Sequence, residues 1–135
     1  MSHESTIQDL LADEVSSESR IVEAETGRTM DLPALRDQAA RVARGLHDLG
    51  LRPGDRLALL LPNTIDWYVL HFAAASLGVL TVPINTRYTQ SEIEGVRRRS
   101  GSRAVAVDAE FMGLNLGGIV ESVMHGHETA LEVVI

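Results

Sequence analysis

Five arginines stand close together between residues 85 and 105 of a chain that is acidic as a whole. The chain contains 12 Lys+Arg and 19 Asp+Glu, a formal net charge of −7. The arginines of this stretch are Arg87, Arg97, Arg98, Arg99 and Arg103. A guanidinium presents a planar set of donors that fits a phosphate, whereas cations in the last turn of a helix complement its dipole and stay solvated. The stretch therefore predicts either a site for a phosphate-bearing ligand or a solvated helix end.

Two histidines near the C-terminus, His125 and His127, raise the question of a metal site. They are two positions apart, so they do not share a helix face. A closed metal site needs three or four ligands, and the motif "HGHE" (125–128), with Glu128 beside the two histidines, does not place that many on one helix face. We expect a solvated loop here and assign no metal ligand.

Three other side chains are candidates for contact with a ligand. Trp67 and Tyr68 open a predicted helix and could stack on a ligand, but we expect them to anchor that helix on a sheet. Asp108 ends a predicted strand, where open α/β sheets place functional groups. It is equally well placed to cap a helix, so we assign it no chemistry.

Several catalytic motifs are missing from these 135 residues. The sequence contains no G-x-x-x-x-G-K-[ST] phosphate loop, no G-x-G-x-x-G fingerprint and no G-x-S-x-G elbow. It also contains no Cys, which excludes disulfides, thiolate metal sites and a Cys nucleophile. We assign no catalytic residue.

Composition narrows the class of protein. Hydrophobic residues make up 44% and aromatic residues 4% of the chain, so we expect one globular domain with an aliphatic core. The acidic balance argues against nucleic-acid binding, which needs a basic face. No apolar run approaches the roughly 20 residues of a membrane span, and the first residues do not resemble a secretory signal. We expect a cytoplasmic protein.

Hydrophobic spacing and turn residues predict a mobile N-terminal segment over 1–19 and a single α/β lobe over 20–135. Asp31 is the expected N-cap of the first long helix, and Thr89 with Glu92 forms an expected capping box. The expected elements are a hairpin (21–30), helices (32–49, 64–77, 90–100 and a broken one near 117–125) and strands (56–62, 79–84, 103–108 and 131–135).

The order of these elements predicts the fold. Strands that alternate with helices imply a mostly parallel sheet with helices on its faces, here with an N-terminal β-hairpin. The runs "RLALLLP", "VLTVPI" and "RAVAVD" are continuously apolar. Such runs predict strands that are buried on both faces.

Four pieces of the sequence resemble one family in that family's order. They are "LGLRPGDRLALLLPN", the small-residue helix "AAASLG", the "VLTVPIN" that follows it, and "NTRYTQSEI". Together they resemble the N-terminal part of the adenylate-forming (AMP-dependent synthetase/ligase) superfamily, in its acyl-CoA synthetase branch. The resemblance covers about residues 20–108 closely and 109–135 loosely, and it implies the first lobe of that fold.

The resemblance implies an enzymatic activity, but residues 1–135 lack the motifs that this activity requires. Intact relatives use ATP and Mg to convert a carboxylic acid to an acyl-adenylate, then form a thioester with CoA. Their phosphate loop ending in P-K-G and their later catalytic motifs correspond to positions beyond Ile135. We therefore expect a truncated lobe that is inactive alone and binds none of these cofactors by itself. Its expected partners are the remaining synthetase lobes or a second copy. The alternative is a free-standing, non-catalytic binding or partner module related to that lobe.

The resemblance also offers one binding residue. In some CoA ligases the Arg of N-x-R contacts a CoA phosphate, and the matching residue here is Arg87. Arg97, Arg98 and Arg99 depart from the family pattern, which more often shows acidic or polar residues. For these three we favour a solvated helix end.

Overall fold

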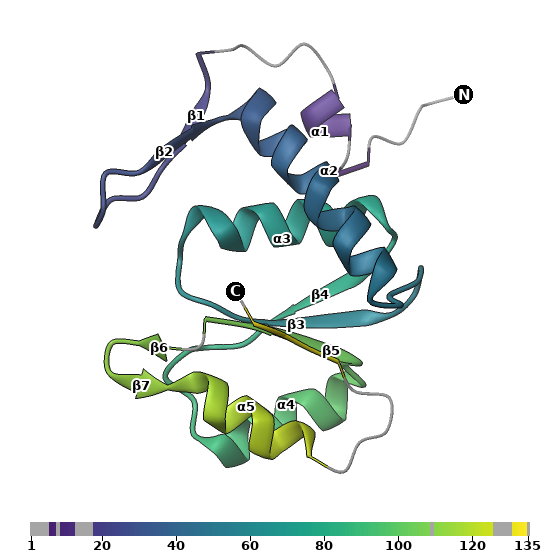
Figure 1. The fold of residues 1–135 in the computed structure, drawn as a ribbon, viewed down its shortest axis with the longest axis vertical. Helices are drawn as coiled ribbons and strands as arrows, with labels where there is room; N and C mark the ends of the chain where they lie inside the picture. Colours follow the sequence, from purple (N-terminus) through teal and green to yellow (C-terminus); the bar gives the residue numbers. More distant parts are fainter. Residues whose placement is uncertain (1–5, 8, 13–17, 109, 126–130, 135) are drawn as a thin grey trace. The chain divides into compact units, whose positions relative to one another are not determined.

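The computed structural model describes residues 6–7, 9–12, 18–108, 110–125 and 131–134; Figure 1 shows the fold. The chain divides into two compact units. One comprises Met1–Pro53 and Asn63–Gly78, and the other comprises Gly54–Pro62 and Val79–Ile135. The predicted mobile segment at 1–19 and the predicted single lobe over 20–135 both remain predictions.

The first unit contains a hairpin and helices. Strands β1 (Arg20–Val22) and β2 (Thr29–Asp31) pair antiparallel, which confirms the predicted hairpin. The helices are α1 (Asp9–Ala12), α2 (Leu32–Asp48) and α3 (Ile65–Ser76). Their shared core is Leu11, Leu35, Ile65 and Val69, against which Ile21, Met30, Leu32, Val42 and Phe72 pack.

Helix α2 begins and ends where its sequence predicts. The side chain of Asp31 accepts a hydrogen bond from the backbone N–H of Ala34 at 2.7 Å, so Asp31 is the N-cap. Gly50 follows the C-cap residue Leu49. Apolar residues recur along one face of this helix. Leu35, Ala39 and Leu46 are buried, but Leu49 is 46% exposed, so the buried face stops one turn before the end of the predicted helix.

The second unit contains a parallel sheet in the order β4-β3-β5-β8, as the alternating pattern predicts. Its strands are β3 (Arg56–Leu60), β4 (Leu80–Pro83), β5 (Ala104–Val107) and β8 (Leu131–Val134). Helices α4 (Gln90–Ser100) and α5 (Leu116–Met124) cover one face of this sheet (Figure 1). The core under them is Ala58, Leu60, Ile84, Ile93, Val105, Val107, Leu116, Val120, Val123 and Met124.

Strand β4 corrects one expectation. Its apolar sequence predicts a strand buried on both faces, but Leu80 is 55% exposed and Pro83 is exposed. The reason is position, since among the described strands β4 pairs only with β3 and so lies at a sheet edge. Pro83 suits an edge because proline cannot donate to a second neighbour. Strands β3 and β5 each lie between two neighbouring strands. As predicted, β3 is buried from Leu57 to its end and β5 is buried throughout.

The segment after β5 contains a small hairpin that the sequence pattern did not predict. Strands β6 (Glu110–Phe111) and β7 (Leu114–Asn115) pair antiparallel around a two-residue turn. Met112 and Gly113 in that turn have φ angles of 49° and 75°, as a type I′ turn requires. Asn115 then caps α5 by accepting a hydrogen bond from Gly118.

Candidate functional site

Helix α4 separates Arg87 from the other arginines of residues 85–105. Arg87 precedes the helix and is exposed. Its backbone N–H donates to the side-chain oxygen of Asn85 at 2.9 Å, and the N–H of Tyr88 donates to the Asn85 carbonyl at 3.1 Å. This turn holds Arg87 just before the capping box, which is present as predicted, with Thr89 as N-cap and Glu92 reaching back to it.

Arg97, Arg98 and Arg99 lie in the last turn of α4, at the opposite end from Arg87. A helix rises 1.5 Å per residue, so the 11 residues of α4 place its two ends about 16 Å apart. Arg98 and Arg99 are exposed. One phosphate group cannot be held by Arg87 and these three together, and their position fits cations that complement the helix dipole.

Arg103 has a structural partner. Its guanidinium donates to the carboxylate of Asp55 at 2.9 Å, with both side chains partly buried. Its backbone N–H donates to the carbonyl of Arg56 at 2.9 Å. The pair ties the start of β5 to the turn before β3. Sequence reasoning missed this ion pair because the two residues are 48 positions apart.

Aromatic side chains form a group along α3. The rings of Trp67 and His71 stack with centroids 5.2 Å apart, and Tyr68 meets Trp67 edge-on at 5.4 Å. Burial lowers the pKa of His71, which favours the neutral imidazole at pH 7. Tyr68 is 42% exposed, and the expectation that Trp67 and Tyr68 anchor this helix on a sheet stays a prediction.

The other sequence candidates remain without chemistry. His125 is exposed, and His127 lies outside the described residues. Within the described part of the chain, no group of three or more His, Asp or Glu residues could hold a metal ion. Asp108 does not cap a helix, since α5 begins later, at Leu116; its N–H instead donates to the carbonyl of Leu60 at 3.4 Å.

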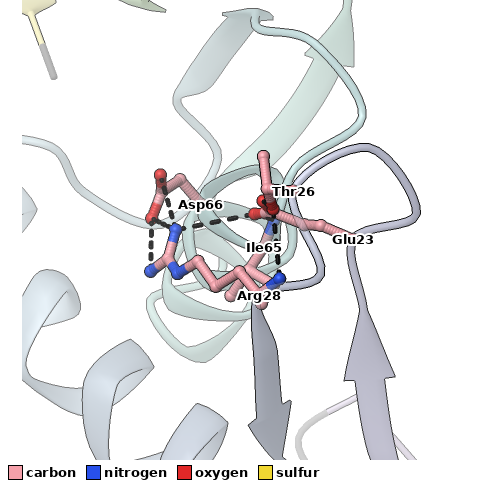
Figure 2. Close-up of polar contacts among 5 residues, drawn as sticks. All are labelled: Glu23, Thr26, Arg28, Ile65 and Asp66. Carbon is pink, nitrogen blue, oxygen red and sulfur yellow. Dashed lines mark hydrogen bonds and ion pairs between the residues drawn. The ribbon is translucent and has the colours of Figure 1, made fainter.

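A polar network that sequence reasoning missed joins the hairpin to α3 (Figure 2). The carboxylate of Glu23 accepts hydrogen bonds from the N–H of Ile65 at 2.8 Å and from the hydroxyl of Thr26 at 2.6 Å. Arg28 lies 3.5 Å from Glu23 and 3.3 Å from Asp66. The hydrogen bonds from Thr26 and Ile65, with the charge of Arg28, hold the pKa of Glu23 below its ordinary value.

Comparison with known proteins gives consistent matches. The family model described as AMP-binding enzyme matches residues 13–132. The long-chain-fatty-acid–CoA ligase FadD13 of Mycobacterium tuberculosis is 40% identical over 88 residues, which are 65% of this chain and 18% of that protein. The mitochondrial medium-chain acyl-CoA ligase ACSF2 of Rattus norvegicus is 34% identical over 82 residues, which are 61% of this chain and 13% of that protein.

The fold gives a match of the same kind. The N-terminal domain of FACL13 from Mycobacterium tuberculosis superposes with a TM-score of 0.82 and 29% identity, covering 97% of this chain and 34% of that chain. The described residues also include no helix that is long and apolar enough to cross a membrane. Because the family model spans most of the sequence and the fold match nearly all of it, this chain belongs to the AMP-binding enzyme family and corresponds to the N-terminal part of its acyl-CoA ligase members.

Proposed function

We propose that this chain forms the N-terminal lobe of a ligase that activates a carboxylic acid with ATP to an acyl-adenylate and then forms a CoA thioester. The observation that carries the proposal is the fold similarity, over 97% of the chain, to the N-terminal domain of FACL13. The relatives FadD13 and ACSF2 are both acyl-CoA ligases, which supports the same reaction class.

In this proposal the lobe has a structural role and does not itself carry out the adenylation chemistry. These 135 residues contain no phosphate loop, and the described residues contain no carboxylate or histidine group suited to a metal ion. Charge on a transferring phosphoryl group must be neutralised by fixed donors and a metal. The residues present do not fit ATP and Mg, so the rest of the ligase fold would supply that chemistry.

The 135-residue chain is expected to show no adenylation by itself. Purified chain, ATP, Mg and a series of fatty acids would be tested for carboxylate-dependent exchange of pyrophosphate into ATP, with FadD13 as the positive control. We expect a signal equal to the blank without fatty acid. Exchange above that blank would contradict the proposed division of labour.

A chimera tests the ligase assignment itself. The segment of FadD13 that aligns with this chain would be replaced by the chain, and the folded product assayed for the same exchange. Recovered exchange supports the assignment. A chimera that folds as well as FadD13 but exchanges no pyrophosphate with any fatty acid tested would count against it.

Within this function, Arg87 is proposed to contact a phosphate of CoA. Support comes from its exposure before α4. Among the contacts described for the chain, it makes a backbone hydrogen bond to Asn85 and no ion pair. Its guanidinium therefore has donors to offer, and Arg–phosphate contacts are charge-assisted hydrogen bonds.

Arg87→Ala is expected to weaken CoA binding about threefold to tenfold, as for one exposed charge-assisted contact. Isothermal titration of the FadD13 chimera with CoA, and with pantetheine as the phosphate-free comparison, measures this effect. Arg98→Ala is the matched control, because it removes the same charge at the far end of α4. Equal affinities of the two variants for CoA would refute the role of Arg87.

A further inference from the structure

Helix α3 begins without a capping side chain of its own. Thr64 occupies the N-cap position, but its side chain accepts no capping hydrogen bond from the helix. The first helical N–H, that of Ile65, donates instead to the carboxylate of Glu23, which is 42 residues earlier in the chain. A carboxylate here satisfies an unpaired donor and lies at the positive end of the helix dipole.

The pleat of the hairpin explains why Glu23 reaches this position. Side chains two residues apart on an extended strand point to the same side. Ile21 packs against the core that contains Ile65, whereas Val22 points away and is 57% exposed. Glu23 therefore follows Ile21 inward and is only 8% exposed. A carboxylate in that setting needs hydrogen-bond partners, and Ile65 and Thr26 provide them.

Arg28 connects this carboxylate to a second one. One of its guanidinium nitrogens lies 3.5 Å from Glu23 and 3.3 Å from Asp66, in the first turn of α3 (Figure 2). Arg28 follows the hairpin turn, so the hairpin contacts the helix at two points, through Arg28 with Asp66 and through Glu23 with Ile65. Glu25, in the same turn, is exposed and makes none of the polar contacts described for the chain.

We propose that Glu23, Arg28 and Asp66 form a latch that makes the β1–β2 hairpin and the first turn of α3 open and close as one unit. Each element satisfies the other, since α3 has no side-chain cap of its own and the buried carboxylate of Glu23 would lose the hydrogen bond from Ile65 if the helix moved away. The latch is a property of the fold and does not depend on the proposed ligase function.

Acid should open the latch. The pKa of Glu23 is lowered in the folded chain, first by the hydrogen bond from Thr26, then by that from Ile65 and by Arg28. A carboxyl with a lowered pKa stabilises the fold above its unfolded pKa, near 4.3, and this contribution is lost as pH falls through the folded pKa. The charged groups facing Glu23 are Arg28 and, through it, Asp66. The latch is therefore closed at neutral pH.

Hydrogen exchange measured by NMR on the 135-residue chain tests the latch. Glu23→Gln keeps the shape of the side chain and removes its charge, which weakens charge-assisted hydrogen bonds. We expect roughly tenfold faster exchange at the amide of Ile65 and also at that of Gly27, which donates to the Glu23 carbonyl in the hairpin turn. Glu25→Gln, with the same change in charge, should alter neither.

A second variant separates a latch from a simple cap. Asp66→Asn leaves the contacts of Glu23 with Ile65 and Thr26 in place and removes only the second anchor of Arg28. A latch predicts faster exchange at Gly27 in this variant also. Unchanged exchange at Gly27 would overturn the proposal and leave Glu23 as a local cap. If Glu23→Gln instead speeds exchange equally throughout β5, global unfolding is the cause. The exchange rate of Gly27 in Asp66→Asn then decides between the latch and a local cap.

Discussion

Leu60→Ala is expected to lower the free energy of unfolding by about 2–5 kcal/mol. Leu60 ends β3, is fully buried, and belongs to the core between the sheet and helices α4 and α5. Removing its branched end loses transfer free energy and leaves a cavity, because strands β4 and β5 hold the backbone on both sides. Folded domains are stable by only about 5–15 kcal/mol, so this one change removes a large share. Urea denaturation followed by circular dichroism measures it.

Leu80→Ala is the matched control for that prediction. It makes the same chemical change in the neighbouring strand β4, where Leu80 is 55% exposed. Substitutions at such positions usually change stability by less than about 0.5 kcal/mol. Equal losses in the two variants would show that β4 is covered in solution, contrary to its place at the edge of the described sheet.

Gly78→Ala is expected to destabilise the fold by about 1–2 kcal/mol or more. Gly78 follows the C-cap of α3 with φ +70°, a left-handed conformation that strains a residue with a Cβ. An added Cβ would also lie 3.3 Å from the Cβ of Pro53, closer than an ordinary contact between carbons. Thermal unfolding and urea denaturation both report the loss.

Two other glycines separate strain from crowding. Gly27 has φ +73° but nothing within 4 Å of an added Cβ, so Gly27→Ala measures the backbone strain alone. Gly45 lies inside α2 with no neighbour in range, and Gly45→Ala should stabilise the chain by about 0.5–1 kcal/mol. A Gly78→Ala loss no larger than that of Gly27→Ala would mean that Pro53 moves aside at no cost.

Local chemistry made the elements of the chain predictable. Asp31 caps α2, and Thr89 with Glu92 caps α4; both caps use residues three positions apart, so they can be recognised without a tertiary structure. The apolar runs at β3 and β5 predicted buried parallel strands for a similar reason. The small hairpin at Met112 and Gly113 escaped prediction because methionine is not a residue that type I′ turns favour.

The candidate site was predictable only in part. The motif around Arg87 placed that residue before the capping box of α4, where the structure has it. The grouping of five arginines did not survive folding, because α4 holds Arg87 apart from Arg98 and Arg99 while Arg103 pairs with Asp55. Arg87 is close in sequence to Arg98 and Arg99, but the rise along α4 separates them in space.

By itself, the sequence determined the order of the longer strands and helices, the caps of α2 and α4, and the resemblance to the family to which the chain belongs. These features depend on residues within a few positions of one another, or on motifs read in linear order. The tertiary structure decided that β4 lies at an edge and that Glu23 caps a helix 42 residues away. Both features depend on which distant segments pack together. Residues near one another in the sequence do not determine that packing.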